Sequence, residues 1–107
     1  MSQLPALDSV IHPVARLRLC ALLAPVDTLE FSRARDAIGI SDSVLSKHVR
    51  ALAEAKYVHI EKRTERGRKR TWLTLTPAGK SAFTGHVAEL RRLASASLEP
   101  APGPPSG

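Results

Sequence analysis

The sequence predicts an α+β domain, mostly α-helical, in which a two- or three-stranded sheet lies between several helices and one long final helix. Three patterns predict this fold. Apolar residues recur at three- and four-residue spacing over residues 42–55, which is typical of an amphipathic helix. Two stretches of alternating apolar and polar residues flank Gly67 and predict a β-hairpin. Thr76 and Pro77 then form a helix start, and the apolar positions that follow indicate a helix over residues 77–98.

Length and charge indicate one domain and a negatively charged partner. The 107 residues include 16 Lys and Arg against 10 Asp and Glu, which gives a net charge of +6. Residues 7–98 carry the patterned sequence. Residues 1–6 are predicted to be a flexible N-terminus, and the Pro/Gly-rich residues 99–107 a disordered tail. We find no secretory signal and no run of apolar residues long enough to span a membrane, so we expect a cytoplasmic protein without membrane contact.

The first part of the chain predicts three helices and one short strand. They are expected, in this order, as a short helix over residues 7–11, a helix over 13–24, a brief strand within 26–31 and a helix over 32–38. The second of these helices is expected to be buried on two sides, and Arg16 and Arg18 to project from its polar side. Its apolar residues are Val14, Leu17, Cys20, Ala21 and Ala24 on one side, with Leu19, Leu22 and Leu23 nearby.

Residues 41–55 are the centre of the predicted domain. Gly39 permits a sharp turn, and Ser41 is a natural cap for the helix that follows. The inward face of this helix is apolar and is expected to comprise Val44, Leu45, Val49 and Leu52, with His48 at its border as a packing residue or a phosphate donor. The outward face carries hydroxyls and cations but no acid: Ser43, Ser46, Lys47 and Arg50. A helix, a glycine turn and a capped helix form the order of a helix-turn-helix, and this outward face suits base edges and phosphates. Residues 42–55 are therefore predicted to be a DNA recognition helix.

The densest charge cluster of the chain occupies residues 62–70 around Gly67, at the tip of the predicted hairpin. We expect its cations to contact backbone phosphates, and Arg66 or Arg68 to enter the minor groove. The cations assigned to this role are Arg63, Arg66, Arg68, Lys69 and Arg70. A merely solvated loop is the alternative, but it would leave these clustered charges repelling one another. Trp72 is expected to pack at the base of the hairpin.

The final helix is longer than the domain needs. A helix of about 20 residues spans about 30 Å, which exceeds what is required to cover a core of this size. We therefore expect it to pair with the same helix of a second subunit, through Val87, Leu90, Leu93 and Leu98. The alternative is a helix that frays after Arg92.

Catalysis and metal binding find little support in the sequence. The four histidines lack ligand-like spacing, and the single cysteine, Cys20, lies in an apolar run where a buried thiol is expected. The acidic residues are scattered over polar faces. We accordingly expect no enzyme activity, no metal site and no cofactor.

Three segments of the chain resemble bacterial winged helix-turn-helix repressors. HPVARLRLCALLA is similar to their opening helix, GISDSVLSKHVRALAEAKYV to their turn, recognition helix and first wing strand, and LTLTPAGK to their second wing strand and following helix. The resemblance covers about residues 7–93 and points to the small, single-domain relatives of the MarR and ArsR regulators. It implies that residues 43, 46, 47 and 50 enter the major groove. These relatives usually have glycine after the recognition helix where this chain has Lys56, so we expect a steric penalty or a different helix end there.

Together these observations predict a homodimeric transcriptional regulator that binds a specific double-stranded DNA site and represses by occlusion. Two recognition helices would occupy successive major grooves about 34 Å apart, with the wings on the flanks. A small-molecule effector, which the sequence does not identify, could bind in a cleft between the terminal helices of the dimer. Two alternatives stay open: a winged helix that binds a protein partner, and a non-specific architectural DNA-binding protein.

Overall fold

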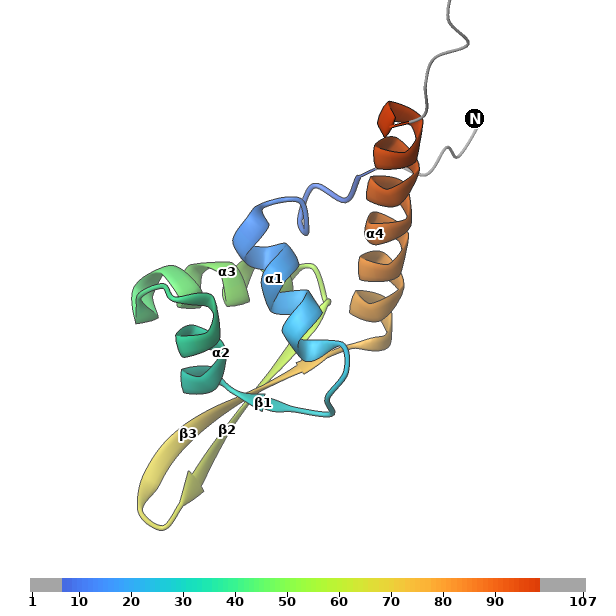
Figure 1. Cartoon of the computed structure of the whole chain (residues 1–107). Coiled ribbons are helices and arrows are strands. Elements are labelled where there is room, and N and C mark those ends of the chain that lie inside the picture. Colours follow the sequence, from blue (N-terminus) through green and yellow to red (C-terminus); the bar gives the residue numbers. More distant parts are fainter. Residues whose placement is uncertain (1–6, 99–107) are drawn as a thin grey trace, which may run out of the picture.

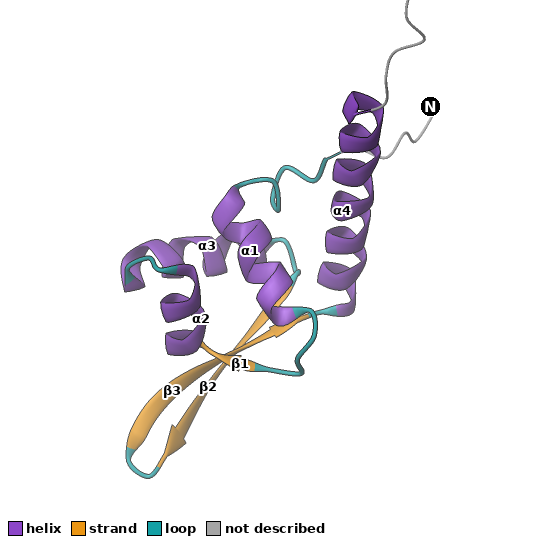
Figure 2. Cartoon of the chain, in the orientation of Figure 1, coloured by secondary structure: helices purple, strands orange, loops and turns teal. Residues whose placement is uncertain are grey.

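The computed structural model describes residues 7–98. The flexible N-terminus expected at residues 1–6 and the tail expected at 99–107 lie outside the described residues. The elements follow one another as α1 (Val14–Leu23), β1 (Leu29–Glu30), α2 (Phe31–Ile38), α3 (Asp42–Glu54), β2 (Val58–Glu65), β3 (Arg68–Leu75) and α4 (Pro77–Leu98). Helices α1, α2 and α3 gather beside the sheet, α4 stands at one end, and the β2–β3 hairpin projects beyond the helices (Figures 1 and 2). This arrangement confirms the predicted winged helix-turn-helix fold.

The sheet is antiparallel, with strand order β1-β3-β2. Leu29 of β1 lies opposite Leu73, and the β2–β3 pairing runs from Val58 opposite Leu75 to Glu65 opposite Arg68. We call the β2–β3 hairpin, residues 58–75, the wing. Its two turn residues, Arg66 and Gly67, have φ angles of 51° and 77°. Two positive φ angles in a two-residue loop define the tight turn that matches the twist of paired strands, and this turn fixes the register of the wing.

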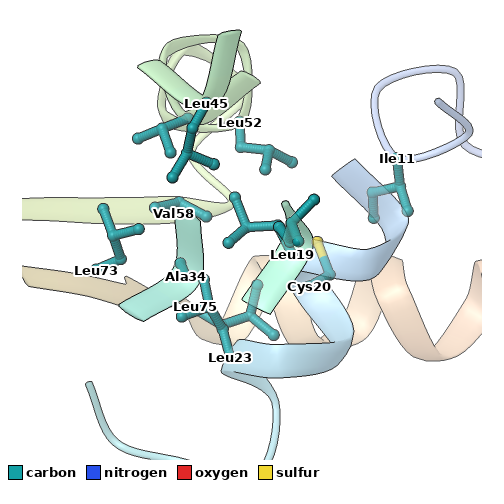
Figure 3. Close-up of a cluster of buried hydrophobic side chains, with 12 residues drawn as sticks. Ile11, Leu19, Cys20, Leu23, Ala34, Leu45, Leu52, Val58, Leu73 and Leu75 are labelled. Atoms are coloured by element: carbon teal, nitrogen blue, oxygen red, sulfur yellow. The ribbon is translucent and has the colours of Figure 1, made fainter. Parts of the chain in front are cut away.

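The core is formed where α1, α2, α3 and the base of the wing meet (Figure 3). Its completely buried side chains include Leu19 and Leu23 of α1, Leu45 and Leu52 of α3 and Leu73 of β3. These residues follow the helical and strand periodicities of the sequence, so one apolar stripe from each element closes the core.

Cys20 is fully buried in this core, as the sequence indicates. Burial, assisted by the negative charge of Asp8, raises the pKa of Cys20 to about 11. The thiol is therefore neutral at physiological pH and packs as a small apolar side chain.

The prediction of a short helix over residues 7–11 is wrong, because the structure has a turn there and no helix. The Asp8 carboxylate accepts hydrogen bonds from the backbone N–H groups of Val10 (2.8 Å) and Ile11 (3.1 Å), which gives the backbone an alternative to helical pairing. Its other oxygen accepts from the Tyr57 hydroxyl at 2.7 Å, and the Asp8 N–H donates to Nδ1 of His86 at 2.9 Å. Asp8 thus joins the start of the chain to the end of α3 and to α4.

Two apolar residues expected to be buried are exposed. Val14 of α1 has 69% of its surface exposed and Val44 of α3 has 43%. In α1 the buried residues are Leu19, Cys20 and Leu23, so Cys20 is buried as expected and Val14 lies outside the buried stripe. In α3, Val44 lies next to the buried stripe but on the solvent side of Leu45.

Helix α4 begins with the expected cap. The Gly79 N–H donates to Oγ1 of Thr76 at 3.0 Å, and the Thr76 hydroxyl donates to the Lys56 carbonyl at 2.7 Å. The helix then packs on the body of the domain through Gly79 and His86, both of which are buried. Its observed bounds match the helix predicted over residues 77–98.

Lys56 adopts the left-handed conformation, with φ of 67°, which is the first of the two outcomes expected at this position. Replacing it by glycine should stabilise the protein by about 1 kcal/mol, because the left-handed region penalises a Cβ atom by roughly that amount. Thermal and urea unfolding measure the change. Lys80→Gly is the matched control: Lys80 is an exposed residue inside α4, where glycine should cost about 1 kcal/mol. A Lys56→Gly variant as destabilised as Lys80→Gly would contradict the observed helix end.

Candidate nucleic-acid interface

Helix α3 turns three of its four predicted contact residues to solvent. Ser43, Lys47 and Arg50 are exposed, and Ser46 is half-buried. Within residues 7–98, the side chains of Lys47 and Arg50 form no salt bridge and no hydrogen bond, so both cations are available to a ligand.

The N-terminus of α3 is fixed from two sides. The Ser41 hydroxyl oxygen accepts a hydrogen bond from the Val44 N–H at 3.3 Å, which is the expected cap. Arg35 of α2 donates to Asp42 at 2.8 Å and also to Asp36 at 3.0 Å. The pair with Arg35 supplies a counter-charge to Asp42, the acid that would otherwise repel a nearby phosphate.

His48 joins α3 to α1 through a hydrogen bond. It is half-buried, and its Nδ1 accepts a hydrogen bond from Nε of Arg16 at 3.1 Å. Burial and the charges of Arg16 and Lys47 hold the pKa of His48 below its usual value. The expectation that Arg16 projects from the polar side of α1 is therefore wrong: Arg16 is half-buried and also donates to the Val10 carbonyl at 3.3 Å. His48 is a packing residue of the recognition helix, which was one of its two expected roles.

A groove of about 410 Å³ separates α3 from the wing. It is lined by Phe31, Asp42, Ser46, Val49, Arg50, Ile60, Lys62 and Thr71. Arg50 of α3 and Lys62 of the wing bring positive charge to it from its two sides, and Phe31, Val49 and Ile60 give it an apolar part. Helix α3 and the wing thus line one groove, which a single partner could contact from both sides.

The wing cations predicted to bind DNA fall into two groups. Arg66, Arg68 and Lys69 are exposed at or beside the turn and form no ion pair within the described part of the chain. Arg63 and Arg70 are already engaged. Nε of Arg63 lies 2.8 Å from Glu61, and its guanidinium lies 5.2 Å from the ring centre of Trp72.

Arg70 contacts two acids, Glu30 of β1 at 3.3 Å and Glu65 at 3.8 Å. The acids of the neighbouring strands supply much of the counter-charge that the sequence-based argument had assigned to a partner. Trp72 is half-buried beneath Arg63, which agrees with the expected packing role.

Lys62 is the contact candidate that sequence reasoning left out. It lines the groove opposite Arg50, although the sequence pattern indicates only that it lies at the edge of the charge cluster. The available signal was strand alternation: Lys62 follows Ile60 by two residues, so both point to the same face of β2.

The predicted interface residues of α4 differ in exposure. Val87 and Leu90 are half-buried, whereas Leu93 and Leu98 are 40% and 83% exposed. The second half of α4, from Arg91 to Leu98, is exposed throughout.

Residues 7–98 contain neither a cluster of metal-ligating side chains nor a helix that could cross a membrane. No group of three or more His, Cys, Asp or Glu side chains within this range is placed to hold a metal ion. None of the helices in the same range combines the length and hydropathy that a membrane crossing requires.

The sequence of this chain is similar to one protein-family model and to a protein of an archaeon. A family model described as a winged helix DNA-binding domain matches residues 15–94. An uncharacterized protein of Methanocaldococcus jannaschii is 27% identical over 84 residues, which cover 78% of this chain and 91% of that protein.

Solved structures show the same fold. A transcriptional regulator homologue from Pyrococcus horikoshii superposes with a TM-score of 0.79 at 20% identity, over 84% of this chain and 89% of that chain. A protein of Enterococcus faecalis, described as a transcriptional regulator of the MarR family, gives a TM-score of 0.66 at 27% identity, over 84% and 86% of the two chains. The fold is that of MarR-like regulators.

Proposed function

Because this chain belongs to the family of winged helix DNA-binding domains, we propose that it is a transcriptional regulator that recognises a specific double-stranded DNA site as a homodimer. The observation that carries the proposal is the shared groove, in which the cations of α3 and the wing face one space. We propose that the protein acts in the cytoplasm as a repressor, by occluding the DNA it covers. Catalysis forms no part of this function.

The contacts divide between the two elements. Arg50 and Lys47 of α3 can reach guanine O6 and N7 in the major groove, while Ser43 and Ser46 can bond to bases or to the backbone. Arg66, Arg68 and Lys69 surround the wing tip, from which they would contact phosphates or the minor groove. In this proposal α3 supplies specificity and the wing supplies affinity.

Dimerisation is proposed to occur through α4. Leu93 and Leu98 are exposed apolar residues on its second half, and Val87 and Leu90 continue the series toward the body of the domain. A second copy of α4 would cover them and place two recognition helices on one face of a duplex. Leu93→Glu should shift the protein toward the monomer in sedimentation equilibrium, whereas the exposed Arg91→Glu, on the same helix, should not.

The DNA experiment is selection from a random duplex pool by the purified protein. We expect a two-fold symmetric consensus, bound about 10³-fold or more tightly than random duplex at the same salt concentration. DNA binding without enrichment would indicate an architectural protein. Absence of salt-sensitive DNA binding would indicate a protein-interaction domain instead.

A small-molecule effector is a further part of the proposal. NadR, a solved protein with this fold, is described in complex with 4-hydroxyphenylacetate. We propose that the cleft between the terminal helices of the dimer holds a comparable small molecule. Release of the selected duplex on addition of 4-hydroxyphenylacetate, or of other small aromatic acids, measured by fluorescence anisotropy, tests this proposal.

A further inference from the structure

The wing presents its charged side chains on two faces that have different surroundings. Residues paired across an antiparallel ladder point to the same side, and successive residues alternate. The pair Ile60–Leu73 points toward the core, so the pairs Lys62–Thr71 and Thr64–Lys69 continue the same face. We call this the groove face. The pairs Glu61–Trp72, Arg63–Arg70 and Glu65–Arg68 form the opposite face, which we call the arginine face.

The arginine face is largely neutralised within the protein. Arg63 is bonded to Glu61 and lies over Trp72, and Arg70 is held between Glu30 and Glu65. The hydrogen bond from Arg63 holds the pKa of Glu61 below its usual value, so this acid remains a charged partner. These contacts connect β2, β3 and β1, and they would have to be broken before either arginine could bind a phosphate.

The groove face, in contrast, is not neutralised by ion pairs within the described residues. Lys62 forms no ion pair within residues 7–98, and the Thr71 side chain makes no hydrogen bond in the same range. Both line the 410 Å³ groove with Arg50 and Ser46 of α3. The single acid of the groove, Asp42, is paired with Arg35 at 2.8 Å.

We propose that this groove holds one strand of the DNA sugar–phosphate backbone, with Lys62 and Thr71 as phosphate contacts, and that Arg63 and Arg70 act inside the protein to stiffen the wing. The inference rests on the proposed function and deepens it, because it names which wing residues touch DNA.

The chemistry of the groove fits this occupant. A sugar–phosphate strand alternates an anionic phosphate with a largely apolar deoxyribose. Lys62 provides a cation on the wing side of the groove, and Thr71 and Ser46 provide hydroxyl donors. Phe31, Val49 and Ile60 provide the apolar surface against which the sugar rings can pack. A free phosphate ion would use the cation and leave this apolar surface wet.

The test compares Lys62→Ala with Arg63→Ala, two neighbouring variants that each lower the net charge by one. Binding to the selected duplex and to a random duplex is measured by fluorescence anisotropy over a series of salt concentrations. For Lys62→Ala we expect weaker binding to both duplexes. The plot of log K against log salt should become less steep, its negative slope decreasing in magnitude by about 0.9 for each protomer. Arg63→Ala should leave the slope unchanged and lower the thermal midpoint of the free protein.

Two further variants separate loss of contact from loss of structure. Lys62→Arg keeps the cation and should restore the slope, and Thr71→Val keeps the shape but should weaken binding to both duplexes. If wild type binds DNA while Lys62→Ala retains the full slope and Arg63→Ala loses it, the inference is overturned and the proposed function stands. If wild type shows no salt-dependent binding, the proposed function itself fails.

Discussion

Gly79→Ala should destabilise the protein by about 2 kcal/mol or more, although alanine is normally the better residue in a helix. Gly79 is buried in the first turn of α4. A Cβ atom at this position would collide with the carbonyl oxygen of Tyr57 and lie 2.7 Å from Cδ1 of Leu75. The Tyr57 carbonyl is part of the backbone and accepts a hydrogen bond from the Thr76 N–H at 2.9 Å, so it cannot move aside as a flexible side chain could. We expect thermal unfolding to show a midpoint lowered by roughly 8–16 °C.

Gly85→Ala is the matched control, because it makes the same change six residues later in the same helix. Gly85 is exposed, and a Cβ atom there would meet no other atom within 4 Å. This variant should raise stability by up to about 1 kcal/mol through helix propensity alone. Opposite signs for the two variants would confirm that α4 docks against the loop after α3. If both alanines stabilised the protein, that docking would be wrong.

Much of the fold could be predicted from the sequence because its signals are local. The recognition helix begins after Ser41, whose hydroxyl caps it, and the observed helix ends at Glu54, one residue before the predicted end. The wing follows from alternation on both sides of Gly67, and α4 follows from Thr76 and Pro77. Caps, turns and periodicity act over a few residues, so one sequence is enough to read them.

The errors concern contacts between distant parts of the chain. Residues 7–11 carry a plausible helix pattern, but Asp8 bonds to Tyr57 and His86, which are 49 and 78 residues away. Arg16 was placed on a polar face, but it bonds to His48 of α3, 32 residues away. None of these three partners could be inferred from the local pattern, because helical periodicity does not say which face of one helix meets another.

The ion pairs of the wing cations were not predicted, for a related reason. A count of cations treats residues 62–70 as one cluster, but the β-ladder separates Lys62 and Lys69 from Arg63 and Arg70. The pairing of Arg70 with Glu30 joins residues 40 positions apart and was not foreseeable. The face of Lys62 could have been assigned, since Ile60 already marked the inward side of β2.

Arg50→Ala should reduce the preference of the protein for its own DNA site. Arg50 is exposed near the middle of α3 and lines the groove opposite the wing, where it can reach base edges. A bidentate arginine–guanine contact discriminates against the wrong base by about 1–3 kcal/mol. We therefore expect about a 5- to 150-fold loss of affinity for the selected duplex for each half-site contacted, at constant salt, with a much smaller loss for random duplex.

The control for this prediction is Arg91→Ala, which removes an exposed arginine from α4 and changes the net charge equally. It should leave the ratio of the two affinities unchanged, because long-range charge acts alike on every sequence. Repeating the selection with Arg50→Ala should also show the consensus relaxed at one base pair in each half-site. An unchanged consensus and an unchanged ratio of the two affinities for Arg50→Ala would mean that Arg50 does not read a base, and the base contact assigned to it would be wrong.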